Sequence, residues 1–327
     1  MAVPRICIIT PMYNEEACFA AYSEAVERVL LSRTDAHYSV LLVDDGSKDR
    51  TWELMQTRCR TSSRYRALRL SRNFGAHAAE TAGLDRCDAD AVAMLSADLQ
   101  DPPETILEFV DAWRHGAEVV WGHRRTRADA NERVWASELF AALLRRFAMP
   151  RDSKFTTGGF LLIDRKVVEC VRQLREHSRL TFGLVAWTGF RQNVVYYDRR
   201  ARIAGKSGWS FGRMIVAMYD ALVGFSTAVP RLVTVVGLTF SLIGTVAAAY
   251  FVFNALFGRP AVGGWSAIMV TLTLFFGITF FILGTICEYL LRIYREVVQR
   301  PLYFVAADTA EPDLSANRPA ELLRALA

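Results

Sequence analysis

The stretch AVAMLSADLQDPP, residues 91–103, decides the fold expected for this chain. Ala91–Leu95 is a short apolar run that predicts a buried strand, and Asp98 and Gln100 follow it two residues apart. Ligands of open α/β sheets sit at the carboxyl ends of the strands, and side chains two apart on an extended chain share a face. The two prolines that follow stop the strand and favour the start of a helix. The stretch therefore predicts a metal–diphosphate site at the edge of a sheet.

Short apolar runs alternate with helix-period segments up to about Tyr197. The runs that predict strands are Ile6–Thr10, Val40–Val43, Ala67–Leu70, Ala91–Leu95 and Val119–Trp121. The segments that predict helices are Glu16–Ser32, Thr51–Arg60, Ala76–Leu84 and Pro103–His115. This rhythm predicts an α/β fold with a mainly parallel, Rossmann-like sheet covered by helices on both faces.

Two uncharged stretches near the C-terminus predict a membrane hairpin. Residues 232–257 and 260–287 hold 26 and 28 residues without a charge, and about 20 suffice to span a bilayer. The alternative is a pair of buried helices in a soluble core. Basic residues flank the pair, whereas the loop between holds only Arg259. The positive-inside rule then predicts a multi-pass protein of the inner (cell) membrane with a cytoplasmic catalytic domain and both termini cytoplasmic.

Composition and the remaining sequence patterns indicate how the chain is divided into parts. The 327 residues carry a net charge of +5 and six scattered cysteines, which argues against a zinc or disulfide framework and fits a reducing cytosol. The N-terminus has no signal-peptide pattern. Trp135–Phe147 and Trp209–Val229 are amphipathic and predict interfacial or core-facing helices. The expected parts are a catalytic domain 1–208, an interfacial helix 209–231, a hairpin 232–289 with spans 232–257 and 265–287, and a tail 290–327, loosely ordered from Ala306.

Two further strand ends carry polar residues. Thr10–Glu16 offers a proline, a tyrosine and an acid that suit a flat base and a ribose, although Asn14 and Glu15 equally suit a helix cap. Val43–Asp49 presents two carboxylates before a glycine, which is also ordinary turn chemistry. Three strand ends with acids or amides at one edge are more specific than any single one.

These motifs occur in an order that resembles a known family. They are Pro11-x-Tyr13-Asn14-Glu15, Val43-Asp44-Asp45-Gly46-Ser47, Ser71-Arg72-Asn73-Phe74-Gly75, Ala97-Asp98-Leu99-Gln100-Asp101-Pro102-Pro103, Arg202-x-x-Gly205-Lys206-Ser207 and Arg300-Pro301-Leu302-Tyr303. The chain resembles, over about residues 5–304, the family-2 glycosyltransferases of GT-A fold that charge polyprenyl phosphates, the dolichyl-phosphate-mannose-synthase and bacterial GtrB type.

The resemblance implies a division of roles. The residues implied to bind the nucleotide donor are Pro11, Tyr13, Glu15, Val43, Asp45 and Ala97. Asp98 and Gln100 would ligate Mg²⁺ or Mn²⁺ that bridges the donor diphosphate. Magnesium prefers oxygen ligands and is often shared between one or two protein groups and substrate phosphates. The metal stabilises the departing nucleoside diphosphate as a Lewis acid.

The acceptor explains why no catalytic base is evident. A phosphate monoester has a second pKa near 6 and is mostly dianionic at pH 7, so it needs cations that position it rather than a base. Arg124, Arg125 and Arg127 follow the fifth strand, and Arg202 and Lys206 precede the membrane segment. We expect catalytic roles for Asp98, Arg124 and Arg202, with phosphate contacts also from Arg125 and Lys206. The alternative for these cations is attraction to anionic lipid.

Three departures from the family pattern qualify the resemblance. Ser96 stands where relatives usually have the first aspartate of Asp-Ala-Asp, and Gly159 stands where they often have aspartate. Many relatives carry lysine at Gly208, for which Lys206 can substitute. His77 is expected to be structural rather than catalytic, although Arg72 and Asn73 beside it can contact the donor or brace the metal loop.

The expected function is inverting transfer of a sugar from a nucleotide sugar to a polyprenyl (undecaprenyl) phosphate. The nucleotide that we expect in the donor is UDP. A GDP-mannose-dependent enzyme is the alternative within the class, and a catalytically weakened membrane scaffold is the alternative outside it. Expected partners are the nucleotide sugar, the polyprenyl phosphate and the bilayer, with no nucleic acid, and a homo-oligomer stays open.

Overall fold

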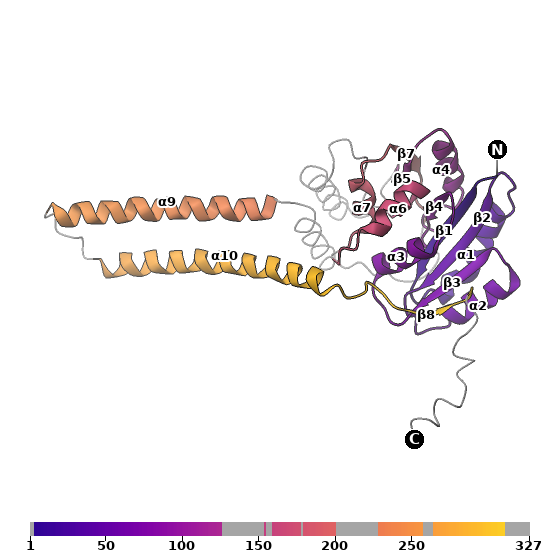
Figure 1. The fold of residues 1–327 in the computed structure, drawn as a ribbon, viewed down its shortest axis with the longest axis horizontal. Coiled ribbons are helices and arrows are strands. Elements are labelled where there is room, and N and C mark those ends of the chain that lie inside the picture. The colour runs from indigo at the N-terminus through magenta and orange to yellow at the C-terminus, as the bar shows by residue number, and fades with distance from the viewer. Residues whose placement is uncertain are drawn as a thin grey trace, which may run out of the picture. The chain divides into compact units, whose positions relative to one another are not determined.

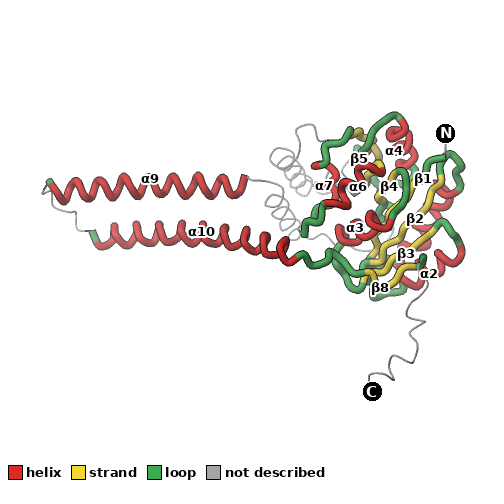
Figure 2. The backbone as a smooth tube through the Cα atoms, in the orientation of Figure 1, coloured by secondary structure: helices red, strands yellow, loops and turns green. Residues whose placement is uncertain are grey.

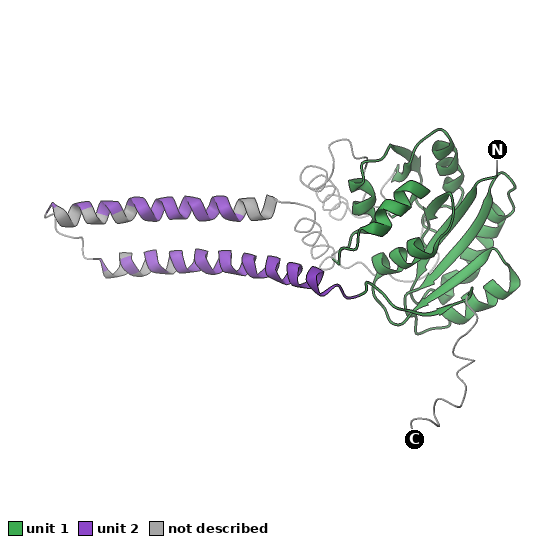
Figure 3. Ribbon diagram, viewed as in Figure 1, with its two compact units in different colours: residues 1–215, 301–327 green, residues 216–300 purple. Residues whose placement is uncertain are grey.

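The computed structural model describes residues 3–125, 154, 159–177, 179–200, 228–257 and 264–310. They form two compact units, residues 1–215 with 301–327 and residues 216–300 (Figure 3). The first unit is built on a sheet with the strand order β7-β5-β6-β4-β1-β2-β3-β8 (Figures 1 and 2). Its strands are β1 Arg5–Met12, β2 His37–Asp44, β3 Tyr65–Leu70, β4 Ala91–Met94, β5 Val119–Arg124, β6 Leu161–Asp164, β7 Gln192–Tyr197 and β8 Val305–Asp308.

The sheet is mainly parallel, as the sequence predicts. Strand β1 pairs in parallel with β2 and β4, β2 pairs in parallel with β3, and β5 pairs in parallel with β7. Strands β6 and β8 run antiparallel to their neighbours. All five predicted strands exist, each within a few residues of its predicted bounds.

The helices of this unit cover both faces of the sheet. They are α1 Glu16–Val26, the π-helix η1 Glu27–Leu31, α2 Thr51–Thr61, α3 Ala76–Arg86, α4 Thr105–Arg114, α6 Arg165–Gln173 and α7 Thr181–Trp187. Helices α1, α2 and α4 share one apolar core with alternate residues of the central strands, such as Ile6 and Ile8. Helix α3 packs on the other face, where a side chain at Gly83 would meet Ile9 at 2.5 Å. The doubly covered sheet explains why the central strands are apolar throughout.

The C-terminal segment corrects one prediction. The sequence predicts a loosely ordered tail from Ala306, but residues 306–308 belong to β8, which pairs with β3. The physical reason is Asp308, whose carboxylate accepts from Arg66 at 2.5 Å and from Arg86 at 3.3 Å. The strand has only four residues, and the polar tail that follows concealed it. Residues 311–327 lie outside the described part of the chain.

The described part of the second unit contains α9 Ala228–Leu256 and α10 Trp265–Val298, which lie side by side (Figure 1). A side chain at Gly244 of α9 would meet Phe275 of α10 at 2.7 Å, so the glycine permits close packing. Within the described residues one stretch, Leu274–Val298, is long and apolar enough to cross a membrane, and Val233–Val246 is a shorter apolar stretch. Helix α10 continues to Val298, beyond the predicted span end at residue 287, so the first residues of the predicted tail are helical. The predicted two-span hairpin remains a prediction.

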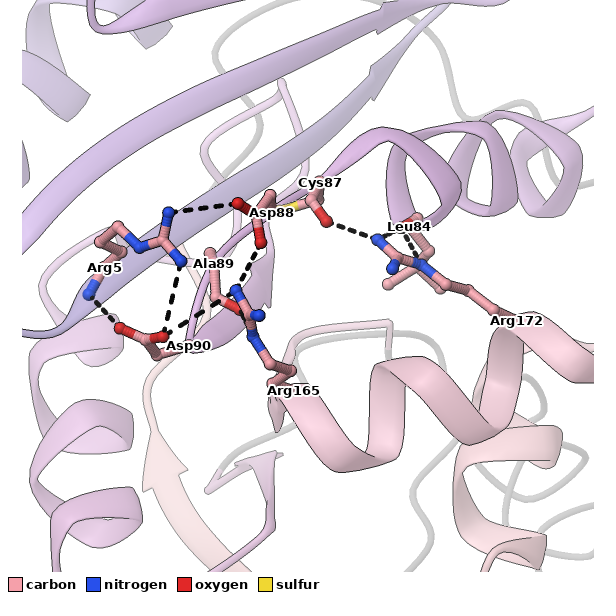
Figure 4. A network of polar contacts seen from close by, with 8 residues as sticks. All are labelled: Arg5, Leu84, Cys87, Asp88, Ala89, Asp90, Arg165 and Arg172. Atoms are coloured by element: carbon pink, nitrogen blue, oxygen red, sulfur yellow. Dashed lines mark hydrogen bonds and ion pairs between the residues drawn. The ribbon is translucent and has the colours of Figure 1, made fainter.

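An ion-pair network joins the amino ends of β1 and β4 (Figure 4). Asp88 contacts the guanidinium groups of Arg5 at 3.2 Å and of Arg165 at 2.5 Å. Asp90 accepts from the backbone N–H of Arg5 at 2.8 Å. Arg172 of α6 donates to the carbonyl oxygens that end α3. This network fastens α6 to the strands at the edge opposite the predicted site. We name it the amino-edge network.

Candidate active site

The carboxyl ends of four parallel strands meet at one edge of the sheet, which we call the carboxyl edge. In the β1–β2 register Pro11 pairs with Val43, so these two predicted donor residues lie on neighbouring strands. Beyond the end of β4, the N–H of Leu95 still donates to the carbonyl of Ile9 at 3.0 Å. The loops after β1, β2 and β4 therefore begin side by side, as the sequence predicts.

Short polar side chains bind the loop after β1 to the loop after β2. The N–H of Asn14 donates to Ser47 Oγ at 3.0 Å, and Asn14 Oδ1 accepts from the N–H of Lys48 at 2.9 Å. The N–H of Glu15 donates to Thr51 Oγ1 at 2.9 Å. Glu15 occupies the N-cap position of α1, but its side chain makes no capping hydrogen bond. The two loops thus form one platform beside the exposed Tyr13.

The two adjacent carboxylates after β2 have different partners. Asp44 accepts from the N–H of Ser47 at 2.8 Å, which is the turn chemistry noted as the alternative, and contacts Arg69 at 3.2 Å. Asp45 instead reaches the loop after β3, where its two oxygens accept from the N–H groups of Phe74 at 2.7 Å and Gly75 at 2.9 Å. Both acids are buried. Burial raises the pKa of the Asp45 carboxyl, although the two N–H donors act in the opposite direction.

Gly46 allows the loop after β3 to approach the loop after β2. Its φ of +71° lies in the left-handed region, and a Cβ there would sit 2.5 Å from the backbone carbon of Arg72. Any other residue would push the two loops apart. The loops after β1, β2 and β3 are therefore held together by backbone and short side-chain contacts.

The loop after β4 departs from the geometry assumed from the sequence. Strand β4 ends at Met94, and residues 97–101 form turns and bends, so strand alternation does not orient Asp98 and Gln100. The N–H of Gln100 donates to Asp98 Oδ1 at 3.2 Å, and Leu99 between them has a φ of +52°. A non-glycine residue in this region costs roughly 1–2 kcal/mol, which the burial of Leu99 helps to offset. The prediction that Asp98 and Gln100 share the face of a strand was therefore wrong. The turn nevertheless keeps both residues at the carboxyl edge.

A tyrosine joins the loop after β4 to β5. The Tyr197 hydroxyl donates to Asp101 Oδ1 at 2.5 Å and accepts from Arg124 Nε at 3.3 Å. Burial raises the pKa of the Asp101 carboxyl, while the hydrogen bond from Tyr197 and the charges of Arg124 and Arg199 oppose that rise. The predicted Arg124 is therefore brought to the predicted metal loop. Arg125 is exposed and lies 3.6 Å from Asp198.

Gln100 is held by the segment after β7. Its side-chain oxygen Oε1 accepts from Arg199 Nη2 at 2.6 Å, and its carbonyl accepts from the N–H of Arg200 at 2.9 Å. Arg200 also contacts Glu104 at 3.3 Å. Arginines from two strand ends thus border the loop 97–101.

The donor set at this edge suits a cation that is shared with a substrate. Among the described residues no cluster of three or more His, Cys, Asp or Glu side chains can hold a metal alone. The Asp98 carboxylate is a hard oxygen ligand, and Mg²⁺ is often bound through one or two carboxylates plus substrate phosphates. Gln100 Oε1 already accepts from Arg199, so it can add a ligand only alongside that contact. The residues fit a metal that arrives with a diphosphate.

The structure shows the surroundings of Ser96 and Gly159, two of the positions that depart from the family pattern. Ser96 is exposed. A Cβ at Gly159 would lie 2.4 Å from the ring of Phe182, so any side chain there would displace the ring. The same ring packs on His77 at 5.4 Å, and His77 Nδ1 lies 3.0 Å from Glu80 Oε2. The predicted residues Arg127, Arg202, Lys206 and Gly208 lie outside the described part of the chain.

Sequence reasoning missed the partners that shape this edge. They are Arg69, Asp101, Tyr197, Arg199 and Arg200. The signal available was the basic run that begins at Arg199 and the acid that follows Gln100. Nothing in the local pattern shows that the end of β7 folds onto the loop after β4, because the contacting residues are 96 and 99 positions apart in the sequence.

Comparison with known proteins identifies the class of this chain. The model of glycosyl transferase family 2 matches residues 7–172, and the chain belongs to that family. It is a glycosyltransferase with a mainly parallel α/β sheet.

Its relatives cover nearly its whole length. The chain is 36% identical over 299 residues to the uncharacterized glycosyltransferase YkcC of Bacillus subtilis (strain 168), covering 91% of this chain and 92% of that protein. It is 30% identical over 303 residues to the SfII prophage-derived bactoprenol glucosyl transferase of Shigella flexneri, covering 92% and 97%. Among solved structures, glucosyl-3-phosphoglycerate synthase from Mycobacterium tuberculosis aligns at 18% identity with a TM-score of 0.48, over 68% of this chain and 80% of that one.

Proposed function

We propose that this glycosyltransferase moves a sugar, with inversion, from a UDP-linked donor to a polyprenyl phosphate at the cytoplasmic face of the inner membrane. The observation that carries the proposal is that one chain contains both a carboxylate loop bordered by arginines and the 25-residue apolar stretch Leu274–Val298. The relative from Shigella flexneri, whose name states a bactoprenol glucosyl transferase, supports the same acceptor class.

The donor would lie across the carboxyl edge. Its nucleoside would contact the platform residues, which are Pro11, Tyr13, Glu15, Val43 and Asp45, and its diphosphate would approach Ala97 and Asp98. Because the Asp45 oxygens already accept two N–H groups, Asp45 would act mainly by shaping the platform. Bound Mg²⁺ or Mn²⁺, held by Asp98 with Gln100, would supply Lewis-acid stabilisation of the leaving diphosphate.

The transfer itself needs no base on the protein. An acceptor phosphate oxygen forms a bond to the anomeric carbon while the bond from that carbon to the diphosphate oxygen breaks, so the nucleoside diphosphate leaves with the electron pair. The acceptor is mostly dianionic at pH 7, and no proton has to be removed. Arg124, fixed by Tyr197, would orient the acceptor phosphate, with Arg125, Arg202 and Lys206 as further cations.

The apolar helices would anchor the enzyme beside its lipid acceptor. We propose that α9 and α10 form a two-span hairpin, with both termini and the catalytic domain in the cytoplasm. Helix α9 runs Ala228–Leu256 and α10 runs Trp265–Val298, and helices of these lengths exceed the roughly 20 residues that a bilayer requires. The arginines near the end of α10 agree with a cytoplasmic end.

A donor panel tests the proposal. Full-length protein in lipid nanodiscs is mixed with undecaprenyl phosphate, Mg²⁺ or Mn²⁺ and one UDP- or GDP-linked sugar at a time, and the lipid is analysed by mass spectrometry. A lipid heavier by one sugar with a UDP donor, lost on addition of EDTA, supports the proposal. Product with GDP-mannose alone favours the alternative donor. No lipid-linked sugar with any donor would overturn the function.

A further inference from the structure

The segment that continues from α10 returns to the carboxyl edge of the catalytic sheet. We name residues 301–309, which include β8, the return segment. Strand β8 runs antiparallel to β3, so its first residue, Val305, pairs with Leu70, the last residue of β3. The chain therefore enters the sheet at the edge where the donor loops lie. Parallel pairing would have brought it in at the opposite edge.

The return segment is fastened independently at both ends. Near its end, Thr309 exchanges two hydrogen bonds with the backbone of Ala67, at 2.9 and 3.0 Å. Asp308 binds Arg66 through both carboxylate oxygens, at 3.0 and 2.5 Å. Near its start, the Tyr303 hydroxyl donates to Asp85 Oδ2 at 2.7 Å. These contacts lie on either side of Phe304 and do not involve its side chain.

Phe304 contacts the loop after β3. Its carbonyl accepts from the N–H of Ser71 at 2.9 Å, and its ring centre lies 6.3 Å from that of Phe74. The guanidinium carbon of Arg72 lies 3.9 Å from the centre of the Phe74 ring. We call Phe304, Phe74 and Arg72 the aromatic stack. Phe304 is 55% exposed and is not part of the apolar core cluster, and its ring pairs with that of Phe74.

The loop that carries the stack lies against the donor platform. The backbone N–H of Phe74 donates to Asp45, and the backbone of Arg72 lies against Gly46. The planar guanidinium of Arg72 is always charged and suits a phosphate. Holding a long side chain in place before binding lowers the entropy lost when a ligand binds.

We propose that Phe304 is a positioning residue of the donor site, which acts through Phe74 to hold Arg72 for the diphosphate of the nucleotide sugar. This inference rests on the proposed function, because it assigns the loop 71–75 to the donor. Donor affinity then depends on the segment that follows the apolar helix, whereas acceptor affinity does not.

Steady-state kinetics of the full-length protein in nanodiscs test the proposal. In Phe304→Ala the KM for the nucleotide sugar should rise about three- to tenfold, the equivalent of one aromatic contact, with the KM for polyprenyl phosphate unchanged. Phe304→Tyr keeps the ring and should restore the donor KM. The matched control is Tyr303→Phe, which removes the neighbouring contact with Asp85 and should leave the donor KM unchanged.

A double-mutant cycle excludes a merely structural effect. Phe74→Leu should raise the donor KM by a similar factor, and adding Phe304→Ala to it should raise it little further, because both substitutions break the same stack. An unchanged donor KM in Phe304→Ala, or equal changes in the donor and acceptor KM, would overturn the proposal.

Failure of the proposed function can be separated from failure of this inference. If no donor yields a lipid product, binding of UDP and of GDP to the wild-type and Phe304→Ala proteins is measured by calorimetry. Weaker binding by the variant, with Tyr303→Phe unaffected, supports the role of Phe304. Equal affinity in all three proteins, or binding by none, contradicts it.

Discussion

The two edges of the catalytic sheet hold their carboxylates in different ways. At the amino edge, Asp88 lies between the guanidinium groups of Arg5 and Arg165 (Figure 4). Hydrogen bonding to Arg5 and the charges of both arginines lower the pKa of Asp88. At the carboxyl edge, Asp45 and Asp101 are buried, and burial raises the pKa of each. At the amino edge the negative charge of Asp88 is balanced by arginines. At the carboxyl edge burial disfavours the charged forms of Asp45 and Asp101.

The two edges also differ in the kinds of group that hold the acids. In the amino-edge network, arginine guanidinium groups pair with aspartate carboxylates and with backbone carbonyl oxygens. The carboxyl edge uses short side chains, backbone N–H groups and positive φ values at Asn14, Gly46 and Leu99 to fix loops around acids. Strained, preorganised loops are characteristic of ligand sites. Substitutions at the two edges should therefore differ in what they damage.

The largest contrast should be in turnover. Asp98→Ala should lower the rate of lipid-linked sugar formation by at least about 100-fold, because it removes the carboxylate proposed to hold the metal. Asp88→Ala, the control at the amino edge, should keep the rate within about twofold, since surface ion pairs contribute little. The rates are measured by mass spectrometry of the lipid. Similar losses in both variants would break the distinction between the edges.

The next contrast concerns stability. Asp45→Ala leaves the N–H groups of Phe74 and Gly75 without their acceptor, and loss of a partner for buried polar groups costs about 1–3 kcal/mol. The free energy of unfolding, measured by denaturant titration with tryptophan fluorescence, should fall by that amount. Asp88→Ala is the comparison and should cause a smaller loss. If Asp45→Ala unfolds at the wild-type denaturant concentration, the hydrogen bonds from Phe74 and Gly75 to Asp45 do not stabilise the fold.

The smallest contrast is in pH dependence. When folding raises the pKa of an acid, the acid stabilises the fold at a pH below its unfolded pKa of about 3.9. That stabilisation is lost as the pH rises through the pKa of the folded state. Asp45 follows this rule, so wild type should lose stability relative to Asp45→Asn as the pH rises above about 4. Asp88 has a lowered pKa, so its contribution is present above about 3.9 and is lost as the pH falls.

Melting temperatures between pH 3 and pH 7 check the two signs. The melting temperature of the wild type minus that of Asp45→Asn should decrease as the pH rises. The melting temperature of the wild type minus that of Asp88→Asn should increase. The same sign for both pairs would contradict the assigned pKa directions.

The sequence predicted the central strands and the meeting of their carboxyl ends, because these depend on local residue patterns. The apolar run Ala91–Leu95 gave a strand because both faces of the sheet are covered, and Pro11 and Val43 meet because parallel strands end together. Strand β8 was missed because Val305–Asp308 has only four residues and directly precedes a polar, proline-containing tail. The ion pairs that hold it come from Arg66 and Arg86, far away in the sequence. The turn at Asp98 was missed because a leucine in the left-handed region is not expected from its residue type.

The nucleotide released in the reaction tests the central claim most directly. Wild-type protein is incubated with its preferred UDP-sugar and undecaprenyl phosphate, and the nucleotide and lipid products are quantified together. The account predicts one UDP for each lipid-linked sugar, because the bond that breaks joins the anomeric carbon to the diphosphate. Release of UMP, with a sugar diphosphate on the lipid, would mean that a phosphorus–oxygen bond breaks instead and would contradict it.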